Sequence, residues 1–160
     1  MKKTLLIIAL SLLSLSVWAQ NAKTIYNKYS GQPKVSAVYI SPAMFKMMGS
    51  IPELEIADED IDLTPIIKNL EGMYIIDSEN KQVNASLRKE INTMISGKEY
   101  ELLMEAKDGD ESVKMFIKCH EDIVKSFIMV CEEEHDELSF IMFDGSILAK
   151  DLNALLTAAM

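Results

Sequence analysis

The stretch that decides the fold is residues 100–143, with the sequence YELLMEAKDGDESVKMFIKCHEDIVKSFIMVCEEEHDELSFIMF. Apolar and polar residues alternate over 100–107 and again over 113–119, and a period of two is typical of β-strands. Turn residues separate the runs at Asp108-Gly109, at Glu121-Asp122 and in the acidic run 132–137. The pattern predicts a four-strand antiparallel meander over 100–107, 113–119, 123–131 and 138–143.

Helices are predicted on both sides of this meander. Before it, Val83, Leu87, Ile91 and Met94 recur at helical spacing, so we expect a helix over 80–96 that ends at Gly97. After it, Asp144-Gly145-Ser146 has the composition of a helix N-terminus. We therefore expect a closing helix whose apolar side is formed by Leu148, Leu152, Leu155 and Leu156.

The first part of the chain alternates short helices and strands. Helices are predicted over 21–30, over 41–48 after the Ser41-Pro42 cap, and from 62 or 64 to 72; strands are predicted over 34–40 and 73–77. Helices that cover one face of a mixed sheet would bury all the apolar stripes. The predicted fold class is an α+β two-layer sandwich, with residues 20–160 as a single domain.

Residues 1–19 have the three parts of a cleaved signal peptide. Lys2 and Lys3 are followed by an apolar run, and Val17-Trp18-Ala19 places small residues at −3 and −1 before Gln20. A membrane span would need about 20 apolar residues, and this run is shorter. We expect export to the periplasm or beyond. Since no cysteine follows the cleavage point, we expect no lipid anchor.

The remaining chain is acidic. Removing Lys2 and Lys3 leaves 14 basic against 25 acidic residues, so the net charge moves from −9 to −11. Arg88 is the only arginine. Nucleic-acid binding needs cations that replace phosphate counterions, and this composition argues against it. It argues equally against binding to an anionic membrane surface.

Three short stretches together resemble a known family. They are VYISPAMF at 38–45, YELLM at 100–104 followed by KDG at 107–109, and FDGSI at 143–147. In order and spacing they resemble the domain-of-unknown-function family numbered 4252, small exported proteins of Gram-negative bacteria. Many members of that family look like lipoproteins, and this chain departs from them because it lacks the lipid-accepting cysteine. The resemblance implies the compartment and the fold and brings no established activity.

The two cysteines and two histidines, Cys119, His120, Cys131 and His135, are the residue types that zinc prefers. In the predicted hairpin, Cys119-His120 lies at one end, opposite Ile123. Eight residues separate Ile123 from Cys131, which is about 26 Å along a strand. This distance argues against a shared zinc and against a disulfide, whose Cα atoms lie within about 7 Å. We expect two packed, unpaired thiols.

The acidic loop 51–62 is the second candidate metal site. Asp58, Asp60 and Asp62 alternate as in a calcium loop, but Leu63 and Asn69 stand where an EF-hand needs glycine and glutamate. An EF-hand is therefore excluded, and we favour a solvated acidic loop over the looser calcium site that stays open. The looser site would use Glu53, Glu55 and Glu59.

Met44, Met47 and Met48 follow the Ser41-Pro42 cap, and thioethers bind Cu(I). Because Phe45 adjoins them, we expect an ordinary apolar helix face. The sequence contains no Gly-x-Ser-x-Gly elbow, glycine-rich phosphate loop or His-Glu-x-x-His helix. Paired carboxylates assembled by folding stay an open route to catalysis.

These observations favour a non-catalytic, periplasmic or secreted module that binds another protein or an envelope component of unknown identity, with no cofactor, no metal and no assigned catalytic residue. Its expected contact surfaces are the loop 51–62 and the outer face of the meander, with Phe116, Phe127 and Met129. The alternatives are a carboxylate-dependent hydrolase of envelope material and a calcium-dependent structural protein.

Overall fold

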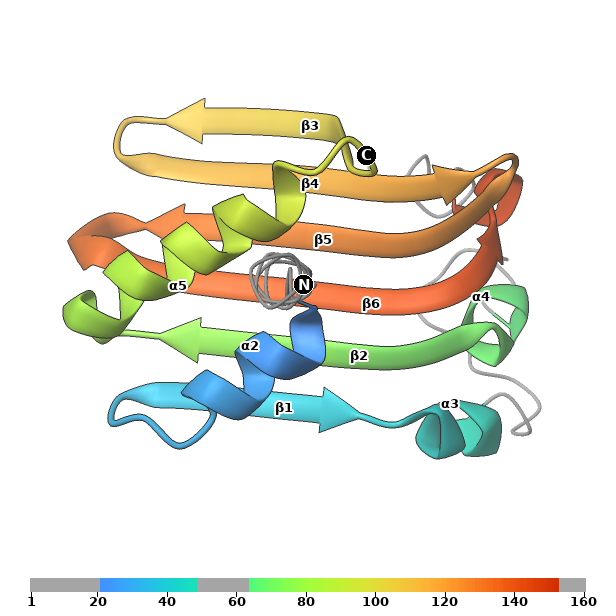
Figure 1. The fold of residues 1–160 in the computed structure, drawn as a ribbon, viewed down its shortest axis with the longest axis horizontal. Coiled ribbons are helices and arrows are strands. Elements are labelled where there is room, and N and C mark those ends of the chain that lie inside the picture. Colours follow the sequence, from blue (N-terminus) through green and yellow to red (C-terminus); the bar gives the residue numbers. More distant parts are fainter. Residues whose placement is uncertain (1–20, 49–63, 153–160) are drawn as a thin grey trace, which may run out of the picture.

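The structure, a computed structural model, describes residues 21–48 and 64–152 and arranges them as one sheet with helices (Figure 1). The helices of this part are α2 (Ala22–Tyr29), α3 (Pro42–Met48), α4 (Thr64–Lys68) and α5 (Lys81–Ile95). Its strands are β1 (Val35–Ile40), β2 (Leu70–Ser78), β3 (Glu101–Asp108), β4 (Glu111–His120), β5 (Ile123–Glu133) and β6 (Glu137–Leu148). Helices combined with an antiparallel sheet confirm the predicted α+β class.

The six strands form one open sheet in the order β1-β2-β6-β5-β4-β3. Each neighbouring pair is antiparallel, so the predicted mixed sheet is wrong. Helix α5 does connect two strands that run in the same direction, β2 and β3, as a crossover helix would. These two strands never pair, however, because β6, β5 and β4 lie between them.

Tight turns join the strands from β3 to β6. Gly109 connects β3 to β4 with a φ of 59°, a left-handed conformation that glycine adopts without steric cost. Glu121 connects β4 to β5 with a φ of 55°, and a 3₁₀ turn over Glu134–Asp136 connects β5 to β6. The predicted turn positions are therefore confirmed.

Helices α2 and α5 lie across one face of the sheet (Figure 1). Ile25 of α2 and Leu87 and Ile91 of α5 are almost fully buried against Ile76 and Phe140 of the sheet. The predicted helix over 80–96 is confirmed as Lys81–Ile95. Burial of its apolar stripe is what fixes this helix to the sheet, since an isolated helix of this length is marginal in water.

A second buried cluster lies at the α4 end of the sheet and consists of Ile66, Val124, Ile147 and Leu152. Phe143 packs against this cluster. Its neighbour in β6, Met142, belongs to the core under α2 and α5. Because successive strand residues point to opposite faces, Phe143 lies on the face away from those helices. The helices therefore do not all lie on one face of the sheet. Helices α2 and α5 cover one face, whereas α4 packs beside the other.

Strand β6 runs straight through Asp144-Gly145-Ser146, so the prediction that these residues cap a helix is wrong. The backbone of β6 passes very close to the end of α4, where the Ser146 N–H donates to the Asn69 carbonyl at 3.0 Å. A Cβ on Gly145 would come within 2.6 Å of the same oxygen. Helical residues begin only at Ala149, and Leu155 and Leu156 lie outside the described residues.

Candidate functional site

A row of six apolar side chains crosses the whole sheet on the face away from α2 and α5. Strand pairing places these residues side by side, one from each strand: Val38, Ile75, Ile141, Met129, Met115 and Met104. Their face follows from their neighbours, because Tyr74, Ile76, Phe140 and Phe116 all pack in the core under the helices. We call these six residues the outer row.

A second row lies beside the outer row and consists of Ile40, Met73, Phe143, Phe127, Ile117 and Glu101. The rings of Phe127 and Phe143 are stacked, with centroids 4.9 Å apart and planes 12° apart. The two rows together, which we call the open face, contain eleven apolar residues and one acid. A sheet face in contact with water normally carries polar side chains, so this surface is unusually apolar for a solvated face.

Among residues 21–48 and 64–152, a buried cluster covers the open face at its Phe143 end. No outer-row residue belongs to, or packs against, either buried cluster of the described part of the chain. Val38 and Met104, on the two edge strands, are 45% and 43% exposed. The four inner members of the row are half-buried. Apolar side chains thus meet solvent across all six strands.

Acidic residues border one end of the open face. The next row begins with Ser36, Asp77 and Ser139, and the Ser139 hydroxyl donates to Asp77 Oδ1 at 2.7 Å. Beyond it, Glu137 pairs with Glu133 across β5 and β6. A pocket of about 380 Å³ opens at this end and is lined by Lys34, Val35, Ser36, Asp77, Ser78, Glu79, Glu137, Leu138 and Ser139. This end of the face is therefore polar and predominantly acidic.

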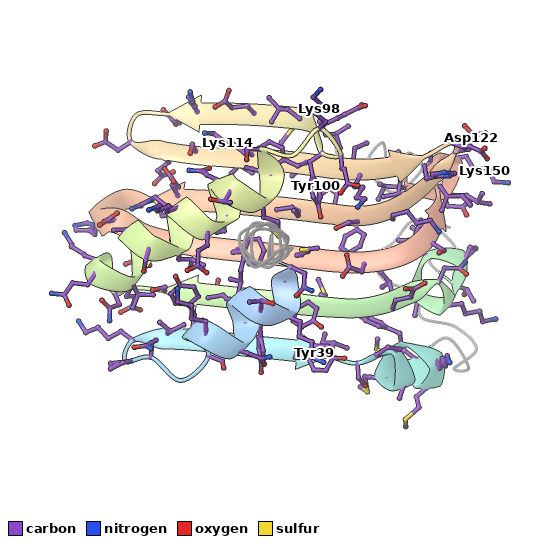
Figure 2. All side chains as sticks on the ribbon, viewed as in Figure 1. Tyr39, Lys98, Tyr100, Lys114, Asp122 and Lys150 are labelled. Atoms are coloured by element: carbon purple, nitrogen blue, oxygen red, sulfur yellow. The ribbon has the colours of Figure 1, made fainter. Side chains whose placement is uncertain are left out.

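The opposite face carries a small polar cluster beside the helices. The Tyr100 hydroxyl donates to Ser126 Oγ at 3.2 Å, and Ser126 pairs with Asp144 across β5 and β6. Figure 2 shows Tyr100 lying over β4 and β5. Burial raises the pKa of Asp144, and the negative charge of Glu71 raises it further, while the hydrogen bond with Ser126 lowers it. Glu71 itself is exposed. The cluster therefore offers a hydrolase one partly buried carboxyl rather than a buried pair.

The structure separates the two cysteines. Cys119 pairs with Val124 rather than Ile123, and Cys131 pairs with Val113, six residues away on β4. This corresponds to about 20 Å along the strand. Cys119 is exposed, so the expectation that both thiols are packed is wrong for it, whereas Cys131 is half-buried. Partial desolvation raises the pKa of both thiols, and nearby carboxylates raise it further, which makes them poorer nucleophiles at neutral pH.

The sequence offers two further candidate metal sites, the methionines of α3 and the acidic loop 51–62. Met44 and Met47 project from α3 into solvent while Phe45 is buried, so the predicted common apolar face is wrong. Asp58, Asp60 and Asp62, with the rest of the loop 51–62, lie outside the described residues. Within residues 21–48 and 64–152, no three His, Cys, Asp or Glu side chains are grouped to hold a metal ion.

The outer row as a whole was missed from the sequence. Phe116, Phe127 and Met129 were expected on one outer face, yet Phe116 packs under the helices and only the other two lie on the open face. The sequence does contain a signal for an apolar second face. In β2, β5 and β6, the runs 73–76, 127–130 and 140–143 are apolar at every position. Such runs predict strands packed on both faces.

None of the helices in the part of the chain that the structure describes is long and apolar enough to cross a membrane. No curated protein and no solved structure matches this chain. The family model described as "Domain of unknown function (DUF4252)" matches residues 29–155 of the 160, a stretch that includes all six strands. The resemblance predicted from the three motifs is confirmed, and the chain belongs to the DUF4252 family.

Proposed function

We propose that this chain is a non-catalytic, exported interaction module that binds another protein through its open face. The observation that carries the proposal is the outer row, an apolar strip that spans six strands without a described helix over it. Contiguous apolar surface of this kind is rare on monomeric proteins and marks interaction sites. Completing the burial of one half-exposed aliphatic side chain would stabilise a complex by about 1 kcal/mol.

Export is part of the proposal and is supported by residues 1–19, with their basic start, apolar run and Val17-Trp18-Ala19. A periplasmic or secreted protein would meet its partner outside the cytoplasm. The absence of a cysteine at the cleavage point supports a protein without a lipid anchor. The binding partner is thus sought among envelope proteins.

The non-catalytic part of the proposal is supported by the polar cluster on the opposite face. Asp144 has Ser126 as a neutral hydrogen-bond partner, the exposed Glu71 as an acidic neighbour and Lys118 as a basic one. Acid–base hydrolysis by two carboxylates needs both groups positioned around the same bond. This cluster lacks that arrangement, whereas the open face needs only a complementary surface.

Site-specific photo-crosslinking in intact cells would test the function. Met115 and Lys114 are adjacent on β4 and point to opposite faces, so they form a matched pair of positions. Figure 2 labels Lys114. Each of the two residues is replaced in the full chain by a photoreactive phenylalanine. We expect a discrete protein adduct from position 115 and none from position 114, because only Met115 belongs to the outer row.

Two results would contradict the proposal. The first is the absence of any protein adduct from position 115 in cells that fold and export the variant. The second is an equal yield of the same adduct from both positions, because it would mean that the contact does not involve the open face.

A further inference from the structure

We infer that the protein bound by the open face is a second copy of this chain, packed sheet against sheet about a two-fold axis. The inference rests on the proposed function of that face and names its partner. Two features carry it: the area of the sheet side on which the open face lies, and the distribution of its side chains between the two halves of the sheet. The position of its charges supplies a test.

The area of the sheet side on which the open face lies suits a stable dimer. Six strands about 4.8 Å apart, with β3 to β6 each 8–12 residues long, give that whole side roughly 30 by 30 Å, or about 900 Å², with the two rows of the open face as its apolar centre and the polar ends as its rim. A standard stable interface buries about 800 Å² on each partner. Interfaces between identical subunits are more apolar than average and contain few charges at their centre. The two rows, with Glu101 as their one charged residue, fit that composition.

The side chains of the outer row divide into two complementary halves. β1, β2 and β6 contribute the branched Val38, Ile75 and Ile141, and β5, β4 and β3 contribute Met129, Met115 and Met104. A two-fold axis parallel to the strands, between β5 and β6, would place each methionine of one copy opposite a branched residue of the other. Methionine is flexible and fills irregular gaps, so such rows can interdigitate at the roughly 10 Å spacing of packed sheets.

In this arrangement the two edge residues of the row meet, because Val38 of one copy lies opposite Met104 of the other. Both are exposed in the single chain, so a charge at either position leaves the buried core of the monomer unchanged. They therefore allow a test that affects the contact between copies without affecting folding.

The charges make the contact sensitive to salt. Asp77, Glu133 and Glu137 lie at the same end of the face, and the axis brings the acidic ends of both copies together. Added salt screens this repulsion without weakening the apolar contact. A dimer should therefore tighten as salt rises, whereas a basic partner bound to the same acidic border would be released.

The protein is recovered after expression of the full chain, and its mass in solution is measured by light scattering at about 0.05 and 0.5 M salt. We expect twice the mass of the chain, with a larger dimer fraction at high salt. Val38→Lys alone and Met104→Glu alone should each weaken association by about tenfold or more, because each buries an unpaired charge. Mixing the two variants should restore a dimer through one Lys–Glu pair. Met47→Glu on α3 is the control and should leave the dimer intact.

Several outcomes would overturn the inference. They are a monomer at both salt concentrations, a dimer that dissociates as salt rises, a dimer that tolerates both single variants, and single variants that are monomeric but fail to pair when mixed. The photo-crosslinking separates this inference from the proposed function. An adduct at position 115 with a mass other than two chains would leave the function standing and remove the second copy as the partner.

Discussion

Asn84 is a polar side chain in the interior of the protein. It is fully buried in α5, and its Nδ2 donates to the carbonyl oxygens of Ser78 and Asp136. The amide thereby ties the helix both to the end of β2 and to the turn between β5 and β6. Its Oδ1 has no hydrogen-bond partner among the described residues. The two donated bonds therefore have to outweigh one desolvated acceptor.

Replacing Asn84 by alanine should lower the free energy of unfolding by about 1–3 kcal/mol, because two buried carbonyl groups lose their donor. Urea denaturation followed by circular dichroism would measure the change. Asn92→Ala is the matched control, since Asn92 lies on the exposed side of the same helix. If Asn84→Ala were no more destabilising than Asn92→Ala, the assigned role of the amide would be wrong.

Asp144 makes stability depend on pH in a defined direction. Its pKa in the folded protein is raised, mainly by burial, so the folded state binds this proton more tightly than the unfolded state. The stability that Asp144 contributes is then present below the unfolded pKa, about 3.9, and is lost as pH rises through the folded pKa. Ionised Asp144 is thus a cost at neutral pH.

Replacing Asp144 by asparagine should therefore raise the free energy of unfolding of the variant relative to that of the parent as pH rises from about 3 to about 7. The measurement is urea denaturation of variant and parent at both pH values, and the comparison at low pH corrects for differences in packing. If the parent instead became more stable relative to the variant as pH rises, the assigned direction of the pKa shift would be wrong.

At the scale of elements, β6 continues through Asp144-Gly145-Ser146 because Gly145 allows two backbones to approach. A Cβ at Gly145 would lie 2.6 Å from the Asn69 carbonyl oxygen and 3.4 Å from Leu70 Cα. Both are backbone atoms that cannot move aside as a side chain would. The junction between α4 and β2 therefore requires glycine, which has no Cβ, at position 145.

Gly145→Ala should destabilise the fold by about 1–3 kcal/mol, since the strand or the end of α4 must shift. Gly31→Ala is the control, because a Cβ there meets no atom within 4 Å, and it should change stability by less than about 0.5 kcal/mol. Thermal unfolding of both variants would compare them. Equal melting temperatures would show that this approach does not constrain the fold.

The same elements show what the sequence could and could not predict. α5 was predictable because its apolar residues recur at helical spacing and Asn80 caps its N-terminus. Its C-cap is Ser96, and Gly97 does not adopt the left-handed conformation of a glycine cap. The β3–β4 turn was predictable because Gly109 meets a local steric requirement. The helix expected after Asp144 failed because the same three residues suit a helix cap and a strand. Pairing with β2, some 75 positions earlier, decides between them.

At the scale of the whole molecule, the sequence predicted the α+β class but not the open face. Strands β2, β5 and β6 are apolar on both sides, while the long helix α5 and the shorter α2 cover one side only. Which side is left open depends on the register of all six strands, and that register results from long-range pairing and from bulges such as the one between Val124 and Ser126. The local alternation of apolar and polar residues predicts neither the long-range pairing nor the bulges.

The central claim is that a protein covers the open face in the cell. Methionine oxidation measures this directly, because Met104 lies in the outer row at 43% exposure while Met47 on α3 is 67% exposed and away from it. Peroxide is applied to intact cells and to dilute purified protein, and mass spectrometry gives the oxidation rate of Met104 relative to Met47. We predict that this ratio is several-fold lower in cells, because a buried thioether is shielded from the oxidant. An equal ratio in cells and in dilute protein would contradict the claim.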